Sequence, residues 1–118
     1  MVDPVVQVIE ITPKAAILLV SGHIDTASCE ALHREISAVQ ANHNPRNIVL
    51  DVSLVEYISS AGIGLCTRLA QELAALGGRL AFVGMPAWVR QPIDMLGYTH
   101  FFDFWDSMYA AGETMAAD

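Results

Sequence analysis

Two adjacent serines, Ser59 and Ser60, stand where an apolar stretch ends and a helical pattern begins. A serine at such a strand-to-helix junction could serve one of three chemical purposes. Its hydroxyl could cap the helix by accepting a backbone N–H, attack a substrate as an activated nucleophile, or accept a phosphoryl group from another protein. Local chemistry alone favours the cap.

The catalytic interpretation lacks its usual sequence surroundings. The strand-to-helix elbow of serine hydrolases is Gly-x-Ser-x-Gly, whereas Tyr57 and Ile58 occupy the positions two before the serines. A triad with a histidine is assembled only in space, so spacing along the chain does not test it. We therefore expect no enzymatic activity, and a serine hydrolase is the catalytic class that remains open.

A nucleotide-binding loop is the second interpretation of this junction. Gly62-Ile63-Gly64 follows a strand and opens a helix, as a pyrophosphate-binding turn would. The third glycine of the dinucleotide fingerprint is absent, because Thr67 stands there, and no Gly-Lys-Ser or Gly-Lys-Thr occurs in the chain. The small residues are expected to let the helix pack closely on a sheet, and we expect no cofactor.

Charge and composition exclude further classes. The chain has 6 Lys and Arg against 13 Asp and Glu, so its attraction to nucleic-acid phosphates would have the wrong sign. Cys29 and Cys66 are isolated and are expected to be buried free thiols, and the histidines show no ligand spacing with them that would indicate a metal site. No apolar run approaches the ~18 residues of a membrane helix, and Met1-Val2-Asp3-Pro4 is not a signal peptide. We expect a cytoplasmic protein without membrane insertion.

The elements that would position the serines alternate along the chain. The β-branched and apolar runs predict strands, the first two forming a hairpin, at Val5–Ile11, Ala15–Ser21, Ile48–Val52, Leu80–Val83 and Phe101–Phe104. Gly22-His23-Ile24-Asp25 is expected to end the second strand. Helices are predicted from about Ala27 to Ala41 and from about Ser60 to Leu76. A short helix is predicted after Gly84-Met85-Pro86, through about Leu96 and ending at Gly97, and a terminal helix after Asp106 or Ser107.

This order predicts one α/β domain over residues 1–118, in which a mixed sheet contains parallel neighbours joined by right-handed crossovers. Helical spacing places Leu32, Ile36 and Val39 on one face of the first helix. In the second helix, Leu65, Leu69, Leu73 and Leu76 recur at intervals of four, four and three. Trp88, Met95 and Trp105 are expected in the core or at its edge.

The whole pattern resembles a known family. Gly22-His23-Ile24-Asp25 follows a strand, Ile48-Val49-Leu50-Asp51-Val52-Ser53 precedes Tyr57-Ile58-Ser59-Ser60-Ala61-Gly62-Ile63-Gly64-Leu65, and Gly77-Gly78 leads into Leu80–Val83. This is similar to the STAS domain (sulfate transporter and anti-sigma factor antagonist), above all to the free-standing bacterial anti-sigma factor antagonists. The resemblance covers about residues 5–117. It implies a mixed sheet of about four to five strands with four to five helices packed on it.

The resemblance also implies a non-enzymatic switch. In that family the unmodified domain binds an anti-sigma factor, a serine kinase of the histidine-kinase-like ATPase fold, and so frees a sigma factor. The kinase phosphorylates a serine at the start of the second helix, the complex dissociates, and a metal-dependent serine phosphatase reverses the modification. Aligning the family's Asp-Ser-Ser-Gly core on Gly62-Ile63-Gly64 makes Ser60 the phosphoacceptor and puts Ala61 in the second serine position. Ser59 then stands where many antagonists carry Asp, which removes an acid beside the acceptor and leaves Ser59 as a rival.

The partner-binding residues that the resemblance implies are Asp25, Ser59, Ser60, Ala61, Gly62 and Ile63. For Asp25, a helix cap is an equally good interpretation, and Asp51 and Ser53 are expected to tie the turn before the second helix. An alternative function is an unphosphorylated scaffold subunit, since stressosome proteins and the small STAS subunit of a bacterial lipid ABC transporter resemble the same pattern.

Overall fold

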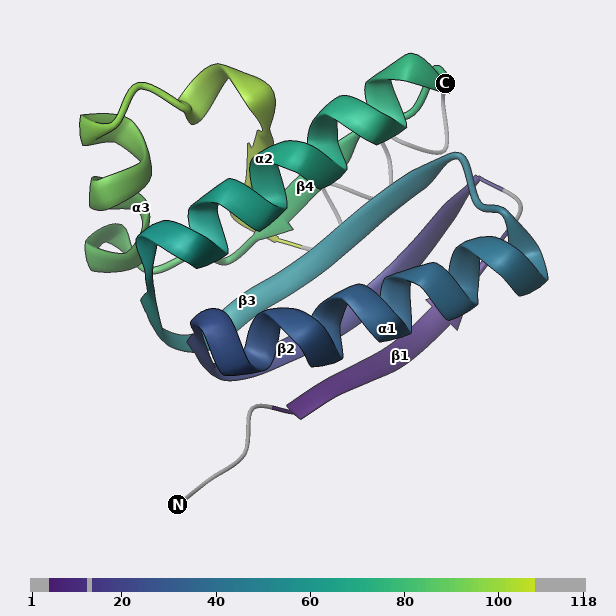
Figure 1. Ribbon diagram of the computed structural model, residues 1–118, viewed down its shortest axis with the longest axis horizontal. Coiled ribbons are helices and arrows are strands. Elements are labelled where there is room, and N and C mark those ends of the chain that lie inside the picture. Colours follow the sequence, from purple (N-terminus) through teal and green to yellow (C-terminus); the bar gives the residue numbers. More distant parts are fainter. Residues whose placement is uncertain (1–4, 13, 108–118) are drawn as a thin grey trace.

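One mixed sheet with helices over it forms the framework of the computed structural model, which describes residues 5–12 and 14–107. The strands, in spatial order, are β1 (Val5–Ile11), β2 (Ala15–Ile24), β3 (Asn47–Ile58), β4 (Leu80–Val83) and β5 (Asp103–Trp105). The helices are α1 (Thr26–His43), α2 (Ser60–Ala75), α3 (Ala87–Met95) and a short 3-10 helix, η1 (Thr99–Phe101). Helices α1 and α2 lie side by side over one face of the sheet (Figure 1).

The strand pairing confirms the predicted mixed α/β sheet. Strands β1 and β2 form the expected antiparallel hairpin, and every later pair is parallel. The hydroxyl of Thr12 accepts the backbone N–H of Ala15 at 3.1 Å and so closes the hairpin turn. Because β2 and β3 are parallel, the helices that follow them, α1 and α2, both begin at the same end of the sheet (left in Figure 1).

The core lies between this helical layer and the sheet. Helix α1 buries Leu32, Ile36 and Val39 as its spacing predicted. On α2 the leucine pattern is right only in its middle: Leu69 and Leu73 are buried, whereas Leu76 is 74% exposed as the C-cap of the helix. Gly77 follows with φ +81°, the left-handed conformation that glycine adopts readily after a helix end.

The predicted ends of β2 and β3 are wrong. Strand β2 continues through Ile24 and β3 through Ile58, so the segment Gly22–Ile24 pairs with β3 and does not end the strand. The register between the two strands shifts between Leu19 and Ser21 and again between Gly22 and His23. Such bulges break the alternation of apolar and polar residues by which a strand is recognised in sequence. Gly22, with φ 86°, supplies the backbone conformation at the second shift.

The number of helices is also different from the prediction of four to five. The described residues contain three α-helices and the single turn of η1. Phe101 belongs to η1, so β5 begins two residues later than predicted. The predicted terminal helix after Asp106 or Ser107 lies outside the described residues. Within the described ranges, no helix has the length and apolarity to cross a bilayer.

Two side chains predicted for the core or its edge lie on the surface. Trp88 is 67% exposed and Met95 is 78% exposed. The reason is the shortness of α3: in its nine residues only Val89 and Ile93, one turn apart, face the core. Trp105 is half-buried against a small cluster of sheet residues, Val49, Ala81 and Val83, as the prediction of a core-edge residue requires.

Candidate functional site

The two serines lie at the junction of β3 and α2, and the structure gives them different surroundings. Ser59 is the N-cap of α2, with extended backbone angles, and its hydroxyl accepts the backbone N–H of Gly62 at 3.1 Å. Its own N–H donates to the carbonyl of Ile24 at 2.8 Å, and its carbonyl accepts the N–H of Ile63 at 2.9 Å. Ser59 is therefore half-buried and committed to holding the helix start.

Ser60 is the first residue of α2 and is exposed. Its hydroxyl has no hydrogen-bond partner within residues 5–12 and 14–107. The hydroxyl sits where the unpaired N–H groups of the first helical turn create a partial positive charge. An incoming negative group at this oxygen would therefore meet a favourable local field.

The different surroundings predict different effects of removing each hydroxyl. Ser59→Ala deletes the cap and is expected to lower the free energy of unfolding by about 1 kcal/mol. Ser60→Ala deletes no intramolecular bond and is expected to change it by less than about 0.5 kcal/mol. Urea denaturation of both variants measures the difference, and equal losses would contradict the assignment of Ser59 as the cap.

The residues after the serines anchor the helix start to the sheet. A β-carbon at Gly62 would lie 2.5 Å from the carbonyl oxygen of Ile24, so only glycine fits where α2 approaches the backbone of β2. Ile63 is 1% exposed and packs in the core. Ala61, by contrast, is exposed beside Ser60. Gly62 and Ile63 thus hold the exposed Ser60 and Ala61 in place from the interior side, and they do not present side chains to solvent.

Asp25 caps α1 at the same end of the sheet. Its carboxylate accepts the backbone N–H of Ser28 at 3.0 Å, and its own N–H donates to the hydroxyl of Ser28 at 2.8 Å. This reciprocal arrangement is a capping box. The hydrogen bond from Ser28 lowers the pKa of the Asp25 carboxyl below its ordinary value. Asp25 therefore has a structural role. Its carboxylate is also half-exposed, so it can contact a bound protein.

The lowered pKa predicts how stability depends on pH. A carboxyl whose pKa is lower in the folded state adds stability above its unfolded pKa of about 3.9, and this stability is lost as the pH falls through the folded value. Asp25→Asn, which keeps a capping oxygen, should therefore be less stable than the wild type at pH 7 and equally stable well below pH 3. Urea denaturation at both pH values checks this. If the difference in unfolding free energy between the wild type and Asp25→Asn is the same at both pH values, the charge of Asp25 does not contribute to stability.

The late residues of β3 add a surface that the sequence patterns missed. His23 Nε2 lies 3.5 Å from Glu56 Oε2, and the rings of His23 and Tyr57 meet edge to face with centroids 5.7 Å apart. Trp88 donates its indole N–H to the carbonyl of Glu56 at 3.2 Å. Tyr57 is 53% exposed, two residues before Ser59. An exposed aromatic in a strand was the available signal, but the predicted strand ended at Val52.

Asp51 and Ser53 bond to each other, as expected, although within β3 and not in a turn. The Ser53 hydroxyl and backbone N–H both donate to Asp51 Oδ1, at 2.8 and 3.1 Å. These bonds occupy the place where the register between β2 and β3 shifts. Their role is local, and they lie outside the exposed group around Ser60.

Comparison with known proteins gives consistent results. The family model of the STAS domain matches residues 7–111. The putative anti-sigma factor antagonist BtrV of Bordetella bronchiseptica is 30% identical over 95 residues, which make up 80% of this chain and 81% of BtrV. A crystal structure of an anti-sigma factor antagonist from Mycobacterium paratuberculosis has 26% identity and a TM-score of 0.78, covering 97% of this chain and 93% of that one.

The fold also matches the anti-sigma factor antagonist SpoIIAA. Its unphosphorylated form has a TM-score of 0.82 at 18% identity, over 97% of this chain and 98% of SpoIIAA. The phosphorylated form of Bacillus SpoIIAA has a TM-score of 0.72 at 18% identity, over 93% of this chain and 98% of that one. At this identity the likeness shows the shared fold.

Proposed function

Because the chain belongs to the STAS domain family, we propose that it is an anti-sigma factor antagonist whose binding is switched off by phosphorylation of Ser60. BtrV and the mycobacterial structure both carry the description of anti-sigma factor antagonist. In this role the chain is a binding regulator and the substrate of a kinase, and it is not itself an enzyme. Its partner, an anti-sigma factor, acts on sigma factors in the cytoplasm, so we place the chain there too.

The observation that carries the proposal is the contrast between the two serines. Ser60 presents an exposed hydroxyl with no hydrogen-bond partner among the described residues, whereas the hydroxyl of Ser59 is held by the N–H of Gly62. Phosphorylating Ser59 would place the phosphate on the half-buried oxygen that accepts the N–H of Gly62. Phosphorylating Ser60 would break no bond that the structure describes. The geometry therefore supports Ser60 over Ser59 as the acceptor.

In the proposed phosphoryl transfer, this chain supplies the acceptor hydroxyl. The hydroxyl oxygen of Ser60 attacks the γ-phosphorus of ATP held by the kinase, the bond to the β,γ-bridging oxygen breaks, and ADP leaves. The proton of the hydroxyl passes to a base. Since Ser59 replaces the acid found beside the acceptor in many antagonists, we propose that the kinase supplies this base. A metal-dependent phosphatase would restore the hydroxyl by hydrolysis and release inorganic phosphate.

A phosphate at Ser60 would block binding without unfolding the domain. It adds about −1.5 to −2 charge at pH 7, which the N-terminus of α2 tolerates. At an interface that excludes water, however, an unpaired charge costs several kcal/mol. Each 1.4 kcal/mol is tenfold in affinity, so a loss of about 10³ follows from one modified hydroxyl.

We propose a contact surface formed by the exposed residues around this hydroxyl. It comprises Asp25, Ser60 and Ala61, with the half-buried Ser59 between them. Tyr57 extends the surface along β3. Gly62 and Ile63, which the resemblance included, support it from the interior.

A competition experiment tests this function. An anti-sigma factor of the histidine-kinase-like ATPase fold, taken from the same genome, is loaded with its sigma factor, and the unmodified chain is added. We expect the chain to displace the sigma factor, and we expect the chain pre-treated with kinase and ATP not to. Binding without any modification would favour the unphosphorylated scaffold, and failure of every such anti-sigma factor to bind would refute the proposed function.

A further inference from the structure

A groove runs between α1 and α2, next to the proposed contact surface. It has a volume of about 480 Å³ and is lined by Cys29, Glu30, His33, Arg34, Leu65 and Arg68. All six residues lie in the first three turns of their helices. With a rise of 1.5 Å per residue, Leu65 lies about 7.5 Å along α2 from Ser60. A protein that covers Ser60 is therefore within reach of this groove.

The basic side chains of this acidic chain are unevenly distributed. Two of the six, Arg34 and Arg68, line the groove from opposite helices. Neither forms an ion pair or a side-chain hydrogen bond with any residue that the structure describes. The other four all have an interaction partner: Lys14, Arg46, Arg79 and Arg90. The groove thus contains the two arginines that have no ion-pair or side-chain hydrogen-bond partner within the described part of the fold.

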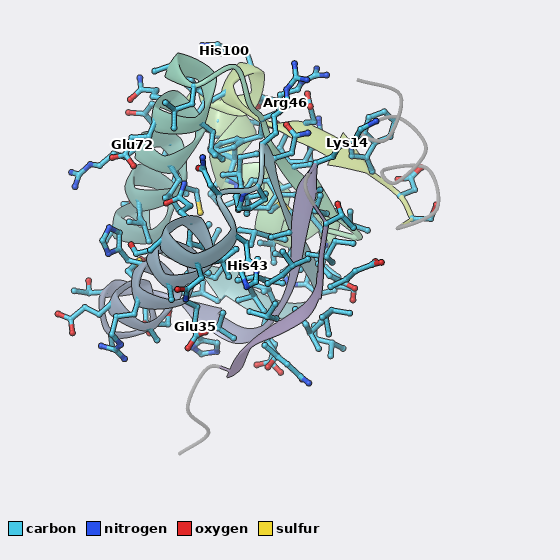
Figure 2. All side chains as sticks on the ribbon, turned by 90° about the vertical axis from the view of Figure 1, so that its right-hand side faces the viewer. Lys14, Glu35, His43, Arg46, Glu72 and His100 are labelled. Carbon is cyan, nitrogen blue, oxygen red and sulfur yellow. The ribbon has the colours of Figure 1, made fainter. Side chains whose placement is uncertain are left out.

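Acidic residues on the same helices leave these arginines available. Glu30 lies four residues before Arg34, and Glu72 lies four residues after Arg68, yet neither is within ion-pair distance of its neighbour. Figure 2 shows Glu72 on the outer side of α2. Exposed pairs at this spacing stabilise a helix only weakly even where they form, so these glutamates do not prevent a carboxylate of a bound protein from pairing with the arginines.

We propose that this groove binds an acidic, amphipathic segment of the same anti-sigma factor that covers Ser60. An apolar side chain of the segment would rest on Leu65 and the half-buried Cys29, and its carboxylates would pair with Arg34 and Arg68. Arginine suits this task because its planar guanidinium binds a carboxylate through two parallel hydrogen bonds. This inference rests on the proposed function, and it adds the chemistry of the partner's docking segment.

The position of the groove adds a second effect of the phosphate. Arg68 lies about 12 Å along α2 from Ser60, at a rise of 1.5 Å per residue. This exceeds the Debye length of about 8 Å at physiological ionic strength, so a phosphate on Ser60 would repel the carboxylates of the docked segment weakly, and more strongly at low salt. The basic groove and the acceptor hydroxyl act together as one charge-sensitive surface.

Neutralising the arginines tests the proposal. The anti-sigma factor that passes the displacement assay is titrated with the wild type, Arg34→Gln, Arg68→Gln and the double variant. We expect Kd to rise about tenfold for each single change and about a hundredfold for both. Lys14→Gln removes the same charge at the end of the sheet opposite Ser60, where Lys14 is labelled in Figure 2, and should change Kd less than twofold.

The two proposals fail in different ways. If the wild type binds and the double variant binds equally well, the docking segment is refuted while the antagonist function stands. If Lys14→Gln weakens binding as much as the arginine variants do, the effect is one of net charge, and the groove is again refuted. If the wild type itself does not bind, both proposals fall.

Cys29 offers an independent measurement of whether the groove is covered. Burial raises the pKa of both thiols, but Cys29 is only half-buried in the groove, whereas Cys66 is 1% exposed and its pKa is raised to about 12. Iodoacetamide at pH 8.5 should therefore modify Cys29 and spare Cys66, and peptide mass spectrometry gives the rate. We expect the anti-sigma factor to slow alkylation of Cys29 at least tenfold. An unchanged rate in the saturated complex would show that the groove stays open.

Discussion

We expect Ser60→Asp to lower the affinity of the chain for the proposed anti-sigma factor by about 10³ without lowering the stability of the domain. The carboxylate places an unpaired charge in a contact that must lose its water, and this costs several kcal/mol. The same carboxylate lies in the first turn of α2, where a negative group interacts favourably with the helix N-terminus by about 0.3–1 kcal/mol. Isothermal titration and urea denaturation of one preparation measure the two effects.

Ser60→Asn is the matched control for this substitution. Asparagine has nearly the size of aspartate but carries no charge, so it separates a steric effect from an electrostatic one. We expect it to retain affinity within about tenfold of the wild type. If Asn weakens binding as much as Asp, the switch works by bulk and the electrostatic account of phosphorylation is wrong.

Gly62→Ala is expected to destabilise the domain by about 2–3 kcal/mol. The added β-carbon would lie 2.5 Å from the carbonyl oxygen of Ile24 and 2.8 Å from Ile24 Cγ2. Because the first obstacle is backbone, the start of α2 has to move away from β2. That movement would also disturb the Ser59 N–H bond to the same carbonyl, so partner binding should fall with stability.

Gly64→Ala provides the comparison on the same helix. A β-carbon at Gly64 meets no atom within 4 Å, and alanine is favoured over glycine in a helix by about 1 kcal/mol. We expect this variant to be as stable as the wild type or more so in urea denaturation. Equal destabilisation by both substitutions would mean that contact with β2 does not decide the effect at Gly62.

The fold was largely predictable from local pattern, and each error in its prediction has a physical cause. Strands β1 and β4 were recognised from their β-branched or apolar runs and the buried face of α1 from its helical spacing, and these predictions are confirmed. The ends of β2 and β3 were missed because two register shifts destroy the alternation of apolar residues there. Trp88 was misplaced because composition gives a tryptophan to the core, whereas α3 is too short to bury more than one stripe.

The sequence predicted where the two serines of the candidate site lie, but it did not predict which other residues share their surface. The pattern from Tyr57 to Leu65 indicated the junction, but spacing alone did not separate a cap from an acceptor. That separation required the hydrogen bond from Gly62 to Ser59 and the exposure of Ser60. The groove arginines lie 34 residues apart in the chain and on different helices, so only tertiary structure brings them to one surface.

The most direct test of the switch is to locate the phosphate. The chain is incubated with the anti-sigma factor kinase and ATP, and its peptides are analysed by fragmentation mass spectrometry. We predict one phosphate, on Ser60, that is absent in Ser60→Ala and still forms in Ser59→Ala. Phosphate on Ser59, or a modified Ser60→Ala variant that releases the partner, would contradict the account.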